Sequence, residues 1–394
     1  MRKQLGLYIH FPFCIQKCHY CDFLSFPYTK NTVKSYLDSL FKEIRAATSY
    51  HDEFDISTLF IGGGTPSLME ADDLLRLMEA LQTSFHMEKA GEITLEVNPG
   101  TLSMAKLKAA RESGINRLSL GLQSCRNAEL KLLGRIHTYE QFLKQFEYAR
   151  LAGFDNINID MMSALPGQTL SDYEETLDGV LDLEPEHISA YSLTIEEGTP
   201  FFNRYNVESS QDLPSESCER QMYHLTNHKL SEKGYHWYEI SNYAKTGFES
   251  KHNMGYWMRK NYLGLGLGAH SLVDNTRFSV PRELGVYLKF WNQPKQISNM
   301  AKYYYENLET LTLAAQMEEY MFLGFRLTRG IERNKFLRTF GISVDSVYGE
   351  VIKKHIKDKL IEETKDKQRL YLTARGIDIS NYVLADFILE GSVN

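Results

Sequence analysis

The sequence predicts an α/β protein with a partial (β/α)6 barrel at its core and a smaller, mainly helical domain after it. Three observations support this fold class. Apolar strand-like runs alternate with amphipathic helical runs over the first 200 residues, which requires parallel strands joined by helical crossovers. Polar and glycine residues fall at the carboxyl ends of the strands, where the loops of a barrel converge. Beyond about residue 300 the alternation gives way to helices.

Six strands and the helices between them account for the predicted barrel. Apolar strands are expected at residues 5–11, 56–61, 93–97, 117–122, 157–162 and 187–193. Helices with apolar residues on one face are expected at residues 32–47, 70–85, 103–113, 139–152 and 171–183. An open sheet wound on both faces is the alternative arrangement, but the polar strand ends on one rim favour the barrel.

The rest of the chain is predicted to form an extension and a separate domain. Residues 193–217 are expected to be a long loop, followed by a helix at 219–233 and a strand at 235–240. Helices are expected at 316–326, 334–340, 346–359 and 376–387, with a short strand at 369–373. The predicted divisions are therefore residues 1–200, 201–305 and 306–394.

Composition argues against several classes of function. The 394 residues carry a net charge of −7, and nucleic-acid binding rests on clustered lysine and arginine, so we expect no nucleic-acid partner. No apolar run approaches the roughly 18 residues of a membrane span, and the chain enters its first strand without an apolar leader. Five cysteines, an odd number with three in one cluster, do not indicate a disulfide framework, so we expect a cytoplasmic protein.

Three of the cysteines, Cys14, Cys18 and Cys21, follow the first strand directly with the spacing C-x3-C-x2-C. Iron–sulfur cubanes are ordinarily held by four thiolates. A tight triad with no fourth cysteine nearby therefore predicts a [4Fe–4S] cluster with one open iron. A structural zinc site completed by His10 or His19 and a set of three inert thiols are the alternative interpretations. The two remaining cysteines lie alone and are expected to be buried, unreactive thiols.

Polar and glycine residues also end the strands that follow the cysteines. They are Gly62, Gly63, Gly64 and Thr65 after the second strand, Glu96 at the third, Gln123 and Ser124 at the fourth, Arg135 in the next loop, and Asp160 at the fifth. Each alone fits a tight turn or a salt-bridged strand end, but together on the cysteine-bearing rim they predict a binding site.

The chemistry of an open iron indicates what that site would bind. Such an iron can chelate the amino and carboxylate groups of S-adenosylmethionine and pass an electron to its sulfonium, which gives a 5′-deoxyadenosyl radical. Glu96 suits the ammonium of this cofactor, Asp160 its ribose hydroxyls, and Arg135 its carboxylate in a charge-assisted pair. The cofactor supplies the hard chemistry, and the protein binds and orients it.

Five short motifs resemble those of the radical SAM superfamily and, more closely, of the oxygen-independent coproporphyrinogen III oxidase family. They are YIHFPFC at 8–14, GGGTP at 62–66, EVNP at 96–99, GLQS at 121–124 and LPGQT at 165–169. The resemblance implies a TIM-type partial barrel with a winged-helix-like C-terminal domain. It also implies that the residues contacting S-adenosylmethionine are Tyr8, Gly63, Gly64, Thr65, Glu96, Gln123, Arg135 and Asp160, with Thr194 as a further candidate.

Two positions separate the oxidase branch of that family from its heme-chaperone branch. The oxidase has a fourth cysteine two residues after the triad, where this chain has Phe23, as the chaperone branch does. The stretch HNMGYW at 252–257 resembles the H-N-x-x-Y-W motif that is associated with heme binding in the chaperone branch. His252 is then the candidate heme ligand, since imidazole is a usual axial ligand of heme iron. A solvated histidine beside aromatics that pack in the core is the alternative interpretation.

The resemblance therefore implies a heme chaperone that binds a [4Fe–4S] cluster, S-adenosylmethionine and heme and delivers heme to an acceptor protein. No catalytic residue is assigned. Oxidative decarboxylation of coproporphyrinogen III is the alternative function, and Phe23 argues against it. We expect a monomer or a weak homodimer. The basic run at residues 353–359 is followed at once by acidic residues and is expected to be a solvated helix face or a protein contact.

Overall fold

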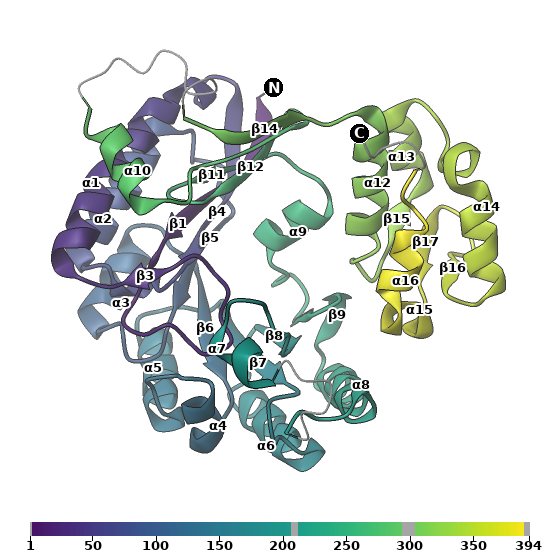
Figure 1. The fold of residues 1–394 in the computed structure, drawn as a ribbon, viewed down its shortest axis with the longest axis horizontal. Helices are drawn as coiled ribbons and strands as arrows, with labels where there is room; N and C mark the ends of the chain where they lie inside the picture. The colour runs from purple at the N-terminus through teal and green to yellow at the C-terminus, as the bar shows by residue number, and fades with distance from the viewer. Residues whose placement is uncertain (1, 206–211, 294–303, 390–394) are drawn as a thin grey trace.

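The computed structural model describes residues 2–205, 212–293 and 304–389 and has a large α/β body beside a smaller helical domain (Figure 1). Six parallel strands form the core of this body in their sequence order: β1 (Lys3–Phe11), β4 (Phe54–Gly63), β5 (Glu92–Val97), β6 (Arg117–Gln123), β7 (Ile157–Ser163) and β8 (His187–Ser192). The predicted partial (β/α)6 barrel is confirmed, and every expected strand ends within two residues of the observed one.

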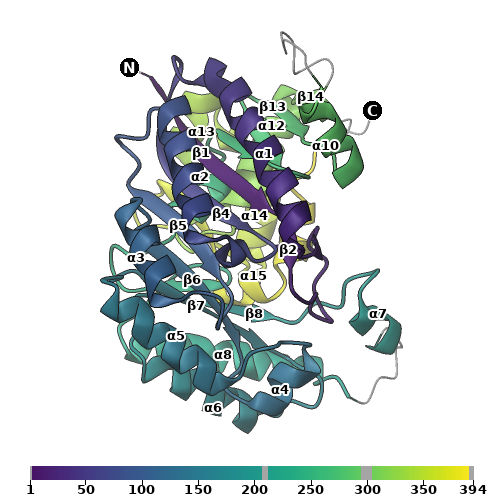
Figure 2. The ribbon, with the colours of Figure 1, turned by 90° about the vertical axis from the view of Figure 1, so that its left-hand side faces the viewer.

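Helices cover the outer face of these strands, as Figure 2 shows. They are α1 (Lys30–Ala46), α2 (Ala71–Ser84), α3 (Met104–Glu112), α5 (Tyr139–Leu151) and α6 (Leu170–Leu181), with the short α4 (Asn127–Leu132), η1 (Ala47–Tyr50) and η2 (Pro66–Leu68) between them. In α1 the Thr29 side chain accepts the Thr32 N–H and caps the first turn. Its apolar stripe, which includes Leu37, Leu40 and Ile44, is buried against the sheet.

The core sheet is longer than the sequence predicts, because short strands extend it at both edges. At one edge β11 (Tyr262–Leu265) runs parallel to β1 and is followed by the antiparallel β12 (His270–Val273), β13 (Thr276–Ser279) and β14 (Glu306–Thr310). At the other edge β10 (Asn242–Ala244) and β9 (His236–Glu239) follow β8. The division at residue 305 stays a prediction, although β14 beyond it belongs to this sheet.

In the described part of this region, four helices accompany the added strands: α7 (Pro200–Tyr205), α8 (Glu216–Glu232), α9 (Lys251–Trp257) and α10 (Leu284–Trp291). The expectation of an unbroken loop over 193–217 is wrong where α7 forms, because Phe201 and Tyr205 bury their rings in a small apolar cluster with Leu133 and Leu165. Residues 206–211 of that expectation lie outside the described residues. The helix α8 begins three residues earlier than expected, where Ser215 caps it through the Cys218 N–H.

The C-terminal helical domain has a hydrophobic core of its own, which includes Met321, Phe336, Tyr348 and Leu370. Its elements are α12 (Leu313–Gly324), β15 (Ile331–Glu332), α13 (Arg333–Phe340), α14 (Val344–Lys357), β16 (Ile361–Glu363), β17 (Arg369–Leu372), α15 (Ala374–Asp378) and α16 (Ser380–Ala385). The three strands form one small sheet in the order β15-β17-β16, so the domain is winged-helix-like. The single helix expected over 376–387 is wrong, because the backbone leaves the helical conformation at Ile379.

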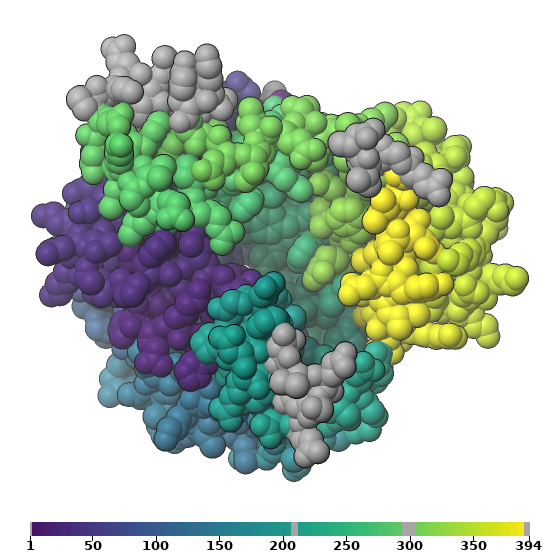
Figure 3. All heavy atoms as spheres, viewed as in Figure 1, coloured from purple at the N-terminus to yellow at the C-terminus, as the bar shows by residue number. Residues whose placement is uncertain are grey.

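The helix α9 lies between the barrel and this domain (Figure 1), and Figure 3 shows a hollow in the surface between the two bodies. The guanidinium of Arg326 lies 4.3 Å from the Trp257 ring centroid, and Arg259 forms a largely buried 2.8 Å ion pair with Glu319. Leu327 also pairs with Glu239 at the edge of β9. The end of α9 is therefore held by both bodies. Among the described residues no helix is long and apolar enough to cross a membrane.

Candidate functional site

One cavity of about 140 Å³ at the carboxyl ends of the barrel strands contains most of the predicted site. All three cysteines of the triad line it, and so do seven of the predicted cofactor residues: Gly63, Gly64, Thr65, Glu96, Gln123, Arg135 and Asp160. These residues come from the ends of β4, β5, β6 and β7 and from the loops that follow β1 and α4. The structure thus brings together residues that lie up to 146 positions apart in the chain, from Cys14 to Asp160.

The loop that carries the cysteines is fixed at its base to the barrel. Its first residues form β2 (Phe13–Cys14), which pairs with β3 (Phe26–Pro27). The Gly64 and Thr65 N–H groups donate to the carbonyls of Phe11 and Phe13, both at 2.8 Å. A Cβ on Gly64 would lie 2.7 Å from the Phe13 carbonyl oxygen, so only glycine permits this approach.

Polar groups of the barrel contact two of the three thiols. The Thr65 hydroxyl lies 3.4 Å from Cys14 Sγ, and Arg135 Nη1 lies 3.6 Å from Cys18 Sγ. Such donors stabilise the negative charge of a sulfur ligand. Burial raises the pKa of Cys14 and raises that of Cys21 to about 11. These raised pKa values favour the protonated thiol. A bound iron would reverse this, because a thiol that coordinates a metal is deprotonated outright.

The thiols line one cavity without converging on a single point. Within the described ranges no three His, Cys, Asp or Glu side chains are arranged to hold one metal ion. A cubane has different geometric needs, because each of its thiolates binds a different iron. The donor set and the contacts of Cys14 and Cys18 therefore fit a cluster better than a single ion.

Neither histidine of the zinc alternative is placed to complete a Cys3His set. The Tyr8 hydroxyl donates to His10 Nδ1 at 2.8 Å, and His10 Nε2 donates to the Leu24 carbonyl at 3.0 Å, so both ring nitrogens are engaged. His19 Nδ1 lies 3.0 Å from the Leu132 carbonyl. Burial lowers the pKa of His10 to about 4, which keeps its ring neutral in this pattern.

Two carboxyl groups, those of Glu96 and Asp160, face the same cavity. Glu96 accepts the Gly63 N–H at 2.9 Å, and burial raises its pKa to about 7. Asp160 accepts from Asn158 at 2.7 Å and from Ser119 at 3.3 Å, and burial raises its pKa as well. A cationic or hydroxyl-bearing ligand would therefore stabilise both carboxylates in a site that excludes most water.

Arg135 is the buried cation opposite these acids, and it is held by groups that the sequence analysis did not single out. Its Nη2 donates to Asn98 Oδ1 at 3.0 Å and to the Gly121 carbonyl at 2.6 Å. Asn98 Nδ2 in turn donates to the Thr65 hydroxyl at 2.9 Å. The signal in the sequence that could have identified Asn98 as a site residue is its position two residues after Glu96. Gln123 has a positive φ of 75°, a strained backbone conformation that is common at functional sites.

Two of the residues predicted to contact S-adenosylmethionine do not line the cavity. Tyr8 lies behind it, with its hydroxyl bound to His10 and its ring stacked 6.2 Å from that of Phe60. Thr194, the further candidate, follows β8 and is exposed outside the cavity lining. Tyr8 would need a change of side-chain conformation to reach a cofactor directly.

The predicted heme ligand His252 is buried at the opposite, amino-terminal end of the barrel strands. Its Nδ1 lies 2.9 Å from the Thr58 hydroxyl, and its Nε2 lies 2.8 Å from the Tyr256 hydroxyl. Burial lowers its pKa to about 3. Glu92 at the start of β5 accepts the backbone N–H groups of Lys251 and His252 at 2.8 and 3.0 Å, and so docks α9 on the barrel.

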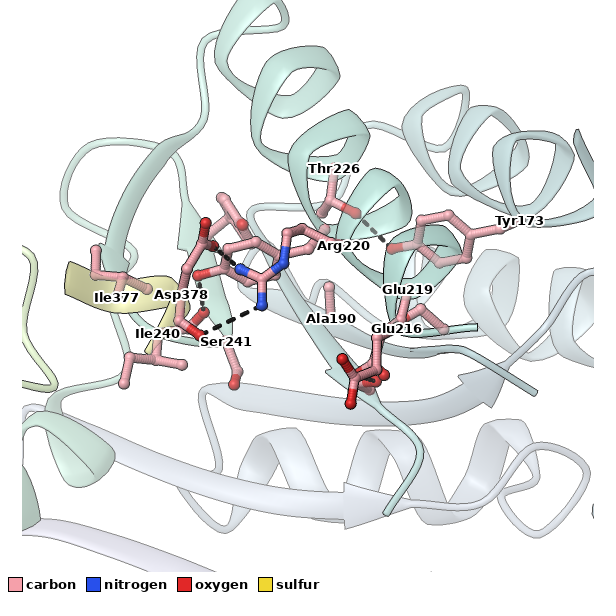
Figure 4. Close-up of a pocket in the computed structure, with 14 residues that line it drawn as sticks. Tyr173, Ala190, Glu216, Glu219, Arg220, Thr226, Ile240, Ser241, Ile377 and Asp378 are labelled. Atoms are coloured by element: carbon pink, nitrogen blue, oxygen red, sulfur yellow. Dashed lines mark hydrogen bonds and ion pairs between the residues drawn. The ribbon is translucent and has the colours of Figure 1, made fainter. Parts of the chain in front are cut away.

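A larger cavity of about 450 Å³ lies elsewhere, between β8, α8 and α15, and Figure 4 shows its lining. Arg220 on α8 and Asp378 on α15 form a 2.7 Å ion pair across it. Glu216 and Glu219 point into the same space, and none of the predicted site residues lines it. This cavity lies between the C-terminal domain and the barrel, and it is separate from the candidate site.

Comparisons with known proteins agree with this geometry. Residues 8–180 match the model of the radical SAM superfamily, and residues 311–379 match that of the HemN C-terminal domain. The solved structure of coproporphyrinogen III oxidase (HemN) from Escherichia coli superposes with a TM-score of 0.83, covering 98% of this chain and 90% of that one. At 23% identity that likeness shows the fold alone.

Sequence relatives narrow the family. The heme chaperone HemW of Lactococcus lactis is 38% identical, covering 99% of each chain, and that of Bacillus subtilis is 36% identical, covering 97% of this chain and 99% of the relative. A mitochondrial radical S-adenosyl methionine domain-containing protein 1 of Danio rerio is 32% identical over 98% of this chain and 86% of its own length. The chain therefore belongs to the heme chaperone HemW family of the radical SAM superfamily.

Proposed function

We propose that the chain is a heme chaperone that binds a [4Fe–4S] cluster, S-adenosylmethionine and heme and delivers the heme to an acceptor protein. The observation that carries this proposal is the near full-length similarity to proteins named heme chaperone HemW. The side chain of Phe23 supports it, because the oxidase branch has a cysteine at this position. The Phe23 ring lies on the rim of the cysteine cavity and is 65% exposed.

The cluster would be held by Cys14, Cys18 and Cys21, and its open iron would bind the cofactor beside them. When bound, the pair would supply one-electron cleavage of the cofactor. Around it, Glu96 would accept the cofactor ammonium and Arg135 would donate to its carboxylate, because both residues line the cavity. Gly63 and Gly64 let the backbone approach, and Gln123 and Thr65 add polar contacts from neighbouring strands.

Heme binding by His252 would require a local rearrangement. A neutral imidazole is the form that ligates metals, and burial already keeps this ring neutral. Both of its nitrogens are engaged, however, so the iron would have to displace the Tyr256 hydroxyl from Nε2. His252 and Tyr256 lie one turn apart on the same helix α9, so releasing Nε2 requires the Tyr256 side chain itself to rotate away.

A hemin titration tests the role of His252. The His252→Ala variant is expected to lose the axial-ligand spectrum of the unmutated protein and to bind hemin more weakly. His228→Ala is the matched control, because His228 is an exposed histidine on α8 that is remote from α9. If the His252→Ala spectrum and stoichiometry equal those of the unmutated protein, His252 is not the ligand.

A second assay separates the chaperone from the porphyrinogen oxidase, whose fold the chain shares. The anaerobically reconstituted protein is incubated with coproporphyrinogen III, reductant and S-adenosylmethionine. We expect no protoporphyrinogen. Its formation at a rate proportional to protein concentration would overturn the chaperone proposal.

A further inference from the structure

A third cavity, of about 220 Å³, lies where the end of α9 meets the C-terminal domain. Its walls include Trp257, Met258 and Arg259 from α9 and the turn that follows it. Arg329, Lys335 and other residues of the C-terminal domain complete them. The cavity is thus built at the end of the helix that carries His252, on the side that faces the other body.

Positive charge dominates this cavity. Arg259, Arg329, Lys335 and Arg369 line it, against Glu332 as the one carboxylate in its lining. Arg369 already pairs with Glu332 at 3.1 Å. The ammonium of the half-buried Lys335 makes no hydrogen bond or ion pair to any residue in the described ranges, and burial together with Lys260 and Arg329 lowers its pKa. The cavity therefore has an excess of cations that the chain itself does not neutralise.

The same cavity also has N–H donors that lack acceptors. The Arg259 side chain is only 9% exposed, and its Nε and Nη1 donate to Glu319 and Asn275 at 2.8 and 2.9 Å. Its Nη2 and the Trp257 Nε1 have no partner among the described residues. Both atoms are buried, so an acceptor in the cavity would reach them only after the Trp257 and Arg259 side chains move. Buried donors without acceptors cost free energy, which favours such a movement when an acceptor is bound.

We propose that this cavity binds the propionate carboxylates of a porphyrin, a function that rests on the heme chaperone proposal above. Carboxylates supply both the negative charge and the acceptor oxygens that the cavity lacks, and arginine and lysine bind them in charge-assisted pairs. The rings of Trp257 and Tyr320 line the cavity and offer flat apolar surfaces beside those cations.

The size and position of the cavity agree with this assignment. Its volume is below the 300 Å³ or so at which pockets enclose a drug-sized ligand, so it would take the propionate edge and leave the macrocycle outside. Trp257 lies five residues after His252, or roughly 7.5 Å along a helix axis. His252 itself is buried against the barrel, so a porphyrin held by its propionates in this cavity would reach that ring only after a local movement of α9.

The test compares hemin with hemin dimethyl ester, in which both propionates are esterified. The unmutated protein is expected to bind hemin about tenfold more tightly than the diester or better, as loss of a charged hydrogen bond would produce. In Lys335→Ala and Arg329→Ala this ratio is expected to fall toward one, mainly through weaker hemin binding. Lys357→Ala is the matched control, because it removes an exposed lysine from α14, and it is expected to keep the ratio.

Each remaining outcome has a distinct meaning. Equal affinity of the unmutated protein for hemin and the diester would overturn the carboxylate site and leave the heme chaperone proposal standing. An unchanged ratio in both Lys335→Ala and Arg329→Ala would do the same. Absence of saturable hemin binding by the unmutated protein would overturn both proposals. Circular dichroism and thermal unfolding of each variant show whether a changed affinity ratio results from misfolding. If it does, Lys335→Gln is a milder replacement for the same comparison.

Discussion

The Tyr238 hydroxyl lies 2.7 Å from His187 Nε2 and at the same time accepts the Ser250 N–H at 3.2 Å. His187 Nδ1 donates to Asn158 Oδ1 at 2.6 Å, and Asn158 donates to Asp160 at 2.7 Å. This buried chain of hydrogen bonds runs from the cofactor cavity to Ser250, the N-cap of α9. The two candidate sites are thus joined through the polar interior of the barrel.

Removing the hydroxyl in the middle of this chain is expected to destabilise the fold. Tyr238→Phe leaves His187 Nε2 and the Ser250 N–H without a partner, which should lower the free energy of unfolding by about 1–3 kcal/mol in chemical denaturation. Tyr243→Phe is the control, because Tyr243 is equally buried on the neighbouring strand and its hydroxyl has no partner among the described residues. Equal losses in the two variants would contradict the importance assigned to Tyr238.

Each cysteine of the triad is expected to be needed for the cluster. Cys14→Ala, Cys18→Ala and Cys21→Ala should each lose most of the iron and sulfide of the reconstituted protein, because a cubane with only two thiolate ligands is poorly held. Cys125→Ala should keep both, since its thiol lies 3.6 Å from the Thr176 carbonyl and outside the cavity. Full iron and sulfide content in a triad variant would exclude that cysteine as a ligand.

Gly64 is expected to tolerate no side chain. In Gly64→Ala the new Cβ would meet the backbone of Phe13 at 2.7–2.8 Å, so the base of the cysteine loop must shift at a cost of about 1–3 kcal/mol. Iron content after reconstitution and the unfolding midpoint should both fall. Gly349→Ala in α14 meets no atom within 4 Å and should stabilise the protein by up to about 1 kcal/mol. A Gly64→Ala protein with normal iron content would show that the loop base is adaptable.

Glu43 is expected to make stability fall as pH rises. Burial raises its pKa to about 7, although Tyr287, Tyr304 and Gly266 donate hydrogen bonds to it. Between the ordinary pKa of 4.5 and about 7 the folded protein keeps a proton that the unfolded chain loses, so this group lowers the free energy of unfolding by about 3 kcal/mol across that window. Above pH 7 its contribution is constant.

Replacing Glu43 tests that sign. Glu43→Gln has no charge at any pH, so its unfolding free energy should decline less steeply than that of the unmutated protein between about pH 4.5 and pH 7. Glu79→Gln, at an exposed position on α2, should keep the original slope. If the Glu43→Gln and unmutated curves are parallel, Glu43 does not titrate in this window.

The barrel and the position of its site were predictable because their signals are local. Apolar runs that alternate with amphipathic helical runs define the strands. Residues such as Glu96 and Asp160 mark the strand ends, where parallel strands bring side chains together. The triad of cysteines needs only its spacing. For these features the chain carries the information within a few residues.

Features that depend on contacts between distant segments were not predictable in the same way. The strand β11 is four residues long, and position 264 within it requires glycine, because a Cβ there would clash with the His270 backbone. One partner of the His252 ring is Thr58, 194 positions earlier, so this contact leaves no mark in the local sequence. The Arg135 contact with Asn98 likewise links two loops.

Titration of hemin into the cluster-loaded protein, followed by the heme absorption spectrum, tests the central claim most directly. We expect binding to saturate at one hemin per chain with a spectrum distinct from that of free hemin. Uptake that rises without saturation, or a spectrum identical to that of free hemin, would contradict it.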